Sequence, residues 1–195
     1  MVCFIEKNPK NGIKKIINLN EEKEAPPEDE SYAMNFSLTT DKGENIADGR
    51  CSVMEDLNST NFLYISAIYV NGNGNYPTIK NPNKYIGMGQ LMIFAAVKYG
   101  LGLNIETVSL VPLDGSEGFY LKMGFHPQVF GDPNRMKANG QAPMSSNGKL
   151  IKKWVDNFEH SSFLHKNFRG TNWIGHTSQI YTQLYGEISR IWDVI

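Results

Sequence analysis

The chain is poor in cysteine and has almost no excess of charge of either sign. Its two cysteines, Cys3 and Cys51, are too few for a disulfide framework and lack the Cys-x-x-Cys spacing of zinc or redox sites. Nineteen basic residues against twenty acidic ones leave a net charge of -1, which provides no basic surface for nucleic acid or an anionic membrane. We therefore expect no nucleic-acid partner, no membrane partner and no metal site.

Long apolar runs are also missing. None approaches the ~20 residues that span a bilayer, and the opening residues 1–5 are far shorter than the hydrophobic region of a signal peptide. With 41% hydrophobic and 20% charged residues, the composition is typical of a globular protein rather than a disordered chain. These features predict one cytoplasmic domain over 1–195, with a core large enough to fold without cross-links.

The first part of the chain is predicted to form strands. One short strand is expected over 12–19, followed by an acidic linker with two prolines over 21–30. Residues 31–40 and 44–54 have the spacing of an antiparallel hairpin. The segment 62–70 is rich in β-branched and aromatic residues, which predicts a central strand buried on both faces.

The middle of the chain alternates between helix and strand. After a long Asn-rich loop over 71–83, apolar residues recur at helical spacing over 88–99, which predicts a buried helix that ends at the glycines after it. A strand is expected over 106–111. The segment 114–117 resembles an Asp-headed capping box and is predicted to open a short helix that ends at Gly124.

The last part of the chain is predicted to be mainly helical. A Pro-, Gly- and Asn-rich connection over 126–148 precedes helices expected over 149–158 and 177–195. In the second of these, apolar residues recur every fourth position: Ile180, Leu184, Ile188 and Trp192. We interpret 149–195 as a C-terminal helical extension. Its tryptophans are interpreted as core residues: Trp154, Trp173 and Trp192.

The clearest chemical signal is the segment Lys84-Tyr85-Ile86-Gly87-Met88-Gly89, between a predicted strand and a predicted helix. Glycines there remove side chains where a ligand must approach backbone, and the first helical turn presents unpaired N–H groups at the positive end of its dipole. Such a place suits an anion. It is neither a Walker A loop, since no Gly-Lys-Ser/Thr follows, nor a Rossmann fingerprint, since Met92 replaces the third glycine. Alternatively, the two glycines only permit a tight strand-to-helix crossing.

A second motif, Ser116-Glu117-Gly118-Phe119-Tyr120-Leu121-Lys122-Met123-Gly124-Phe125, follows the next predicted strand. With both motifs in this order, the chain resembles the GNAT superfamily of acyl-CoA-dependent N-acyltransferases. That family's pyrophosphate motif reads Arg/Gln-x-x-Gly-x-Gly/Ala, and its later helix often reads Phe-Tyr-x-Lys-x-Gly-Phe. The resemblance covers 62–125, the expected CoA-binding core. It implies an α/β fold with a mixed sheet of the α+β kind, acetyl-CoA as co-substrate, and an amine acceptor on a small molecule or protein.

The resemblance also implies roles for individual residues. The general acid that protonates the departing CoA sulfur would be Tyr120, although this side chain could instead be a core aromatic. Lys84 stands where the family prefers Arg or Gln. The family's fourth strand, which usually splays from the fifth and offers backbone to the pantetheine amides, ends at the positions of Ile68, Tyr69 and Val70. Pyrophosphate would be held by the backbone N–H groups of Tyr85, Ile86, Gly87, Met88, Gly89 and Gln90.

Two departures from the family concern the acceptor. No carboxylate occupies the strand from which many members remove the acceptor's proton; Glu55, Asp56 and His126 are candidates in flanking segments, and a water chain from Ser66 is equally possible. The two helices that the family places between its first and second strands are missing. We therefore expect the C-terminal helices to cover the exposed sheet, or to do so for a partner subunit in a homodimer.

Taken together, the sequence predicts an N-acetyltransferase that works by direct attack of the amine, without a covalent enzyme intermediate. Cys51 is interpreted as a buried strand residue because nothing around it resembles a Cys-His pair. A catalytically silent protein that uses the CoA cleft or the fold for binding is the main alternative, and the missing strand carboxylate favours it. A third possibility is an acyltransferase that acts on a macromolecule.

Overall fold

The computed structural model describes residues 2–9, 12–24, 33–71, 85–113, 115–128 and 170–195. In chain order its elements are β1 (Val2–Glu6), β2 (Ile16–Glu24), β3 (Ala33–Thr40), β4 (Asn45–Glu55), β5 (Asn61–Val70), α1 (Met88–Gly102), β6 (Thr107–Leu110), α2 (Glu117–Lys122), β7 (His126–Pro127), β8 (Trp173–His176), α6 (Thr177–Ile188) and β9 (Trp192–Val194). None of these helices is long and apolar enough to cross a bilayer.

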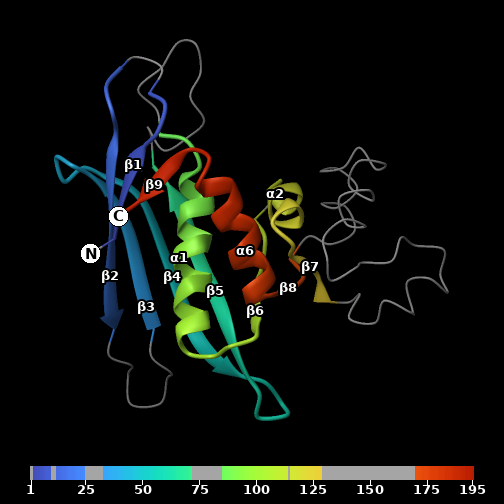
Figure 1. Ribbon diagram of the computed structural model, residues 1–195. Coiled ribbons are helices and arrows are strands. Elements are labelled where there is room, and N and C mark those ends of the chain that lie inside the picture. The colour runs from blue at the N-terminus through green and yellow to red at the C-terminus, as the bar shows by residue number, and fades with distance from the viewer. Residues whose placement is uncertain (1, 10–11, 25–32, 72–84, 114, 129–169) are drawn as a thin grey trace.

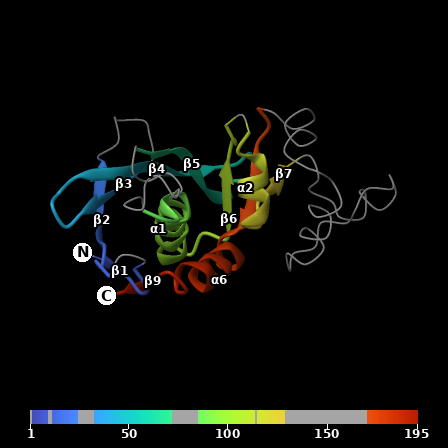
Figure 2. The same cartoon turned by 90° about the horizontal axis from the view of Figure 1, so that it is seen from above.

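All the described strands belong to one mixed sheet, in the order β7-β8-β6-β5-β4-β3-β2-β1-β9. Only β5 and β6 run parallel to each other, and α1 is the crossover helix that this pairing requires. The first and last strands pair at one edge, so the two ends of the chain lie side by side (Figure 1). Seen from above, the sheet curves around α1 and α6 lies on the open side (Figure 2). The expected α/β fold with a mixed sheet is confirmed.

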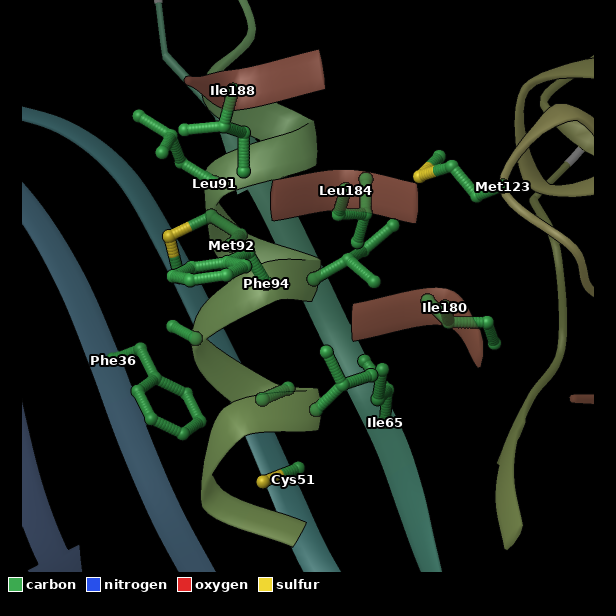
Figure 3. Packing of buried hydrophobic residues seen from close by; sticks show 14 of the residues in the cluster. Phe36, Cys51, Ile65, Leu91, Met92, Phe94, Met123, Ile180, Leu184 and Ile188 are labelled. Carbon is green, nitrogen blue, oxygen red and sulfur yellow. The ribbon is translucent and has the colours of Figure 1, made fainter. Parts of the chain in front are cut away.

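Helix α1 is the centre of the core and is apolar around most of its circumference. Such a helix must be covered on several sides, and Figure 3 shows α1 between the sheet residues Phe36 and Ile65 and the α6 residues Leu184 and Ile188. The predicted buried helix is confirmed. Its predicted end at the following glycines is met at Gly102, the last residue of the helix. Gly100 lies inside the helix, where a Cβ would lie 3.1 Å from the Leu63 side chain, so this glycine permits close packing.

The N-terminal strands extend further than predicted. One strand was expected before residue 30, but β1 and β2 are both present, and the first part of the expected acidic linker belongs to β2. There Glu24 accepts a hydrogen bond from Asn35 and forms an ion pair with Arg50 at 3.1 Å. Partners on β3 and β4 thus hold an exposed, acidic strand end in the sheet. The remainder of that linker, like the loop predicted over 71–83, lies outside the described residues.

The hairpin, the strand after α1 and the short helix are confirmed as β3–β4, β6 and α2. Strand β5 differs from the prediction in its burial. Leu63 and Ile65 are buried under α1, whereas Tyr69 is 60% exposed, because α1 and α6 pack on one face of the sheet. The expected cap of α2 also differs: Ser116 is the N-cap residue, and its hydroxyl donates to the Leu113 carbonyl oxygen instead of capping the helix. Asp114 lies outside the described residues.

The C-terminal segment is less helical than predicted. Helix α6 ends at Ile188, and Trp192 begins strand β9. Two backbone hydrogen bonds between Cys3 and Ile195, at 2.8 and 3.0 Å, attach this strand to β1. The chain leaves the helix here because the edge of β1 offers backbone hydrogen bonds to an extended segment. Strand β8 was not predicted. The helix expected over 149–158 lies outside the described residues.

The expected covering role of the C-terminal region is only partly met. Helix α6 packs against α1 on the face of the sheet that α1 already covers. It contributes Ile180, Leu184 and Ile188 to the core. Trp173 in β8 and Trp192 in β9 are also buried, which confirms these two tryptophans as core residues. The described part of the C-terminal segment is thus an integral part of the sheet and core.

Candidate functional site

Strands β5 and β6 part from each other and leave a gap. Their parallel pairing ends at Ile65 and Leu110, while β5 continues to Val70. The N–H of Asn71 donates to Ile46 in β4, and backbone groups alternate in direction along a strand. The N–H and C=O groups of Ile68 and Val70 therefore point away from β4, into the gap. This is the splayed arrangement that the resemblance implies.

A β-bulge in β5 decides which side chains face the gap. The register between β4 and β5 shifts at Arg50 and Cys51, so that Ser66 is an extra residue in β5. One extra residue exchanges the two faces of a strand. As a result Ile68 and Val70 face the same side as α1, whereas Tyr69 faces the other side. Of the three strand residues predicted for the site, the side chain of Tyr69 is not part of it.

The first turn of α1 offers free backbone donors. Gly87 has φ 78°, a left-handed conformation that favours glycine, and its carbonyl oxygen accepts from the Leu91 N–H at 2.9 Å. Within the described residues, the N–H groups of Met88, Gly89 and Gln90 have no acceptor, as expected at a helix N-terminus. Three adjacent donors at the positive end of a helix dipole suit an anionic group.

Each of the two motif glycines also has a structural reason. Gly87 needs its left-handed backbone, and a Cβ on Gly89 would lie 3.2 Å from Cζ of Phe119 in α2. The alternative explanation, that the glycines permit a tight strand-to-helix crossing, therefore accounts for why both positions are glycine. It does not account for the unpaired N–H groups beside them.

Most of the predicted site residues line one pocket of about 290 Å³ between β5, α1 and α2. Its volume is near the lower end of the range of ligand pockets. The predicted members are Ile68, Val70, Gly87, Met88, Gly89, Gln90 and Tyr120, and the further members are Leu113, Ser116 and Phe119. Phe119 belongs to the Phe-Tyr motif and could have been found from it, whereas Leu113 carries no sequence signal.

Tyr120 lies in this pocket with its ring held by two neighbours. The ring packs edge-on against Phe119, at 5.2 Å between centroids, and against Phe125, at 5.8 Å. Burial raises the pKa of the Tyr120 phenol to about 12. The hydroxyl therefore stays protonated near neutral pH and can donate a hydrogen bond or a proton.

Two other predicted residues, Tyr85 and Ile86, make contacts elsewhere. The ring of Tyr85 lies 5.4 Å from the Lys15 ammonium nitrogen, and the Ile86 carbonyl accepts from the Trp192 indole N–H. Neither residue lines the pocket. The side-chain amide of Gln90 donates to Glu187. Lys84 lies outside the described residues.

None of the candidate bases lines this pocket. Asp56 accepts the N–H groups of Asn58 and Thr60 at 2.8 and 2.9 Å, which makes it a turn residue. The Ser66 hydroxyl donates to the Arg50 carbonyl oxygen in β4. Burial lowers the pKa of His126, and nearby His176 lowers it further, so this imidazole is neutral at pH 7.

Glu55 lies in a second, larger pocket of about 860 Å³. Tyr64 of β5 and Ser109 of β6, which are paired across the two strands, also line it. Their neighbours along each strand, such as Leu63 and Ile65 in β5, are buried under α1 on the other face. The pocket therefore lies on the opposite face of the sheet, next to the point where β5 and β6 separate. Across the described residues, His, Cys, Asp and Glu form no group that could hold a metal ion.

Cys51 is a buried strand residue, as predicted, and burial raises the pKa of its thiol from 9.0 to about 12. Because the folded value is the higher one, the neutral thiol stabilises the fold fully below pH 9, and this contribution is lost as the pH rises toward 12. We expect Cys51→Ala to reduce the alkaline decline of the free energy of unfolding by about 1.4 kcal/mol per pH unit in that interval. Urea titrations at several pH values measure this slope. An unchanged slope, or an equal change in Cys3→Ala, would contradict it.

Comparisons with known proteins show a likeness of fold at low identity. No family model matches the chain, and none of the curated proteins matches it. An acetyltransferase of Trypanosoma brucei is 13% identical over 56% of this chain and 92% of that chain, with a TM-score of 0.44. An acetyltransferase of the GNAT family from Staphylococcus aureus is 11% identical over 74% of this chain and 68% of that chain, with a TM-score of 0.43. The protein in a KacTA–DNA complex is 10% identical over 80% of this chain and 74% of that chain, with a TM-score of 0.45. In fold, the chain is an α/β protein with a mixed sheet in which one parallel pair, β5 and β6, is joined by a crossover helix.

Proposed function

We propose that the chain is an N-acyltransferase that passes the acetyl group of acetyl-CoA directly to an amine. One observation carries this proposal: three features meet at one pocket. They are the N–H groups at the start of α1 and the edge of β5 beyond Ile65, both without partners among the described residues, and the hydroxyl-bearing ring of Tyr120. The three groups match the three parts of the co-substrate that a protein must handle, which are its diphosphate, its amide-containing arm and its leaving sulfur.

The described residues fit acetyl-CoA in two respects. The N–H groups of Met88, Gly89 and Gln90 would bind the diphosphate, as helix N-termini commonly do. The backbone groups of Ile68 and Val70 would pair with the pantetheine amides, in the way that an extended ligand adds to a sheet edge. Apolar side chains from the same two residues would contact the methylene groups between those amides.

Tyr120 would act as the general acid. Acetyl-CoA supplies an activated acyl group as a thioester, and a neutral amine can attack it. A thiol of pKa ~8.5 leaves only moderately well as a thiolate, so a donor aimed at the sulfur speeds departure. The Tyr120 hydroxyl is protonated near neutral pH, and burial, which raises its pKa to about 12, keeps it so even in alkaline solution. Although this burial makes it a weaker acid than a free phenol, it can donate a hydrogen bond to the sulfur and a proton as the sulfur becomes a basic thiolate.

The amine acceptor would approach from the opposite face, through the larger pocket. In support, Tyr64 and Ser109 line that pocket next to the point where β5 and β6 separate, so the two molecules would lie on either side of the same gap. An ammonium of pKa ~10.4 must lose a proton before it can attack. Glu55 is the candidate group to attract the ammonium and accept this proton, because, of the two carboxylates that line the pocket, Asp56 already accepts two backbone hydrogen bonds in its turn.

The alternative is a protein that binds acyl-CoA without catalysis. It is favoured by the smaller pocket, whose described lining contains no carboxylate and no histidine. Catalytic competence therefore depends on whether a base on the far side of the sheet can reach the amine.

One experiment separates these functions. Acetyl-CoA is titrated into the protein by calorimetry, and release of free thiol is then followed with a panel of small amines and short peptides with free N-termini. An acyltransferase binds acetyl-CoA and releases thiol only with a suitable amine. Binding with no thiol release from any amine would favour the silent protein. Absence of binding would refute both.

A further inference from the structure

The C-terminal strand contacts the predicted pyrophosphate loop directly. Trp192, 1% exposed at the start of β9, donates its indole N–H to the Ile86 carbonyl oxygen at 3.1 Å. Its side chain reaches from one end of the chain to the residue just before Gly87. This contact joins two segments that the sequence motif does not connect.

Two further contacts hold the same loop. Lys15, just before β2, places its ammonium 5.4 Å from the centre of the Tyr85 ring and 3.9 Å from the Glu6 carboxylate. Glu187 of α6 accepts a hydrogen bond from the Gln90 side chain at 2.7 Å. Residues from three separate parts of the chain thus contact both ends of the segment that carries the N–H groups.

The Trp192 contact has a specific geometric consequence. A trans peptide is planar, and its C=O and N–H point in opposite directions. The described peptides include no cis bond, so the Ile86 carbonyl and the Gly87 N–H belong to one such plane. A carbonyl held toward Trp192 directs the Gly87 N–H away from Trp192. Gly87 borders the smaller pocket, and its N–H has no acceptor within the described residues.

We infer that Trp192 is a positioning residue that holds the Ile86–Gly87 peptide with its N–H toward the anion site. A loop ordered before binding loses less conformational entropy when the ligand arrives, which increases affinity. The identity of the anion, the diphosphate of acetyl-CoA, rests on the proposed function. The positioning itself does not.

The test compares Trp192→Phe with Trp173→Phe. Both replacements exchange a buried indole for a smaller ring, but the Trp173 N–H has no hydrogen-bond partner within the described residues. Amide hydrogen exchange is measured without ligand, and acetyl-CoA binding is measured by calorimetry. For Trp192→Phe we expect exchange to accelerate at Leu91, whose N–H donates to the Gly87 carbonyl oxygen, and the Kd to rise about fivefold, as for loss of one hydrogen bond. For Trp173→Phe we expect neither change in these two quantities.

The outcomes separate the inference from the proposed function. Equal exchange rates at Leu91 in Trp192→Phe and wild type overturn the positioning role. Faster exchange without acetyl-CoA binding by wild type keeps the positioning role and rejects the proposed ligand. If Trp192→Phe does not fold, the indole ¹⁵N–¹H signals of wild type decide: acetyl-CoA should shift the Trp192 signal and leave the Trp173 signal in place. A Trp192 signal that does not move although calorimetry shows acetyl-CoA bound to wild type overturns the inference.

Discussion

Replacement of Tyr120 by phenylalanine is expected to lower kcat about 100-fold while the Kd for acetyl-CoA stays unchanged. The variant keeps the ring that packs against Phe119 and Phe125 and removes only the hydroxyl. Affinity for the co-substrate depends on backbone groups elsewhere in the pocket. Thiol release at saturating acetyl-CoA and amine measures kcat, and calorimetry measures Kd.

Tyr99→Phe is the matched control for this replacement. Tyr99 lies on α1, its ring has an edge-on contact with Phe36, and it does not line the pocket. Its loss of a hydroxyl should leave kcat unchanged. Full kcat in Tyr120→Phe would rule out Tyr120 as the acid.

The pH dependence of wild-type kcat gives a further test. Because the Tyr120 pKa is about 12, we expect no fall of kcat from ionisation of this residue between pH 7 and 10.

Replacement of Gly87 by valine is expected to weaken acetyl-CoA binding at least about tenfold. Valine strongly disfavours the left-handed backbone that Gly87 adopts at φ 78°, with a cost of roughly 1–3 kcal/mol. Its Cβ would also lie 3.0 Å from Oε1 of Gln90. The loop must therefore rearrange, and the N–H groups at the start of α1 should no longer point together toward one anion. Calorimetric titration with acetyl-CoA measures the effect.

The control for backbone strain is Gly43→Val. Gly43 has φ 80° in the turn between β3 and β4, and no atom lies within 4 Å of a Cβ placed there. This variant should lose a similar amount of stability and keep its affinity for acetyl-CoA. An equal loss of affinity in both variants would mean that instability, not the loop, causes it.

Features with local causes could be predicted from the sequence. The Gly-x-Gly loop and the short helix with Tyr120 depend on residues within one or two turns, and both motifs meet at one pocket. Helix α1 was predicted because its apolar spacing is intrinsic to the segment. In each case a short stretch of sequence contains the whole physical reason.

Features set by distant partners could not be predicted. The orientation of Tyr69 depends on the bulge at Ser66, which arises from pairing with β4 and leaves no signal in β5 itself. Strand β9 depends on the free edge of β1, and Trp192 follows the helical spacing of α6 although it lies in a strand. The larger pocket with Glu55 combines segments from both halves of the chain. Glu55 could be named as a candidate from its place beside β5, but the pocket that it lines could not be predicted from that segment alone.

The most direct test follows the backbone N–H signals of residues 86–90 by NMR while acetyl-CoA is added. If these groups hold the diphosphate, the signals of Met88, Gly89 and Gln90 should shift in proportion to occupancy, and Ile68 and Val70 should respond with them. Saturating acetyl-CoA that leaves all of these signals unmoved would contradict the central claim, whatever changes occur elsewhere in the protein.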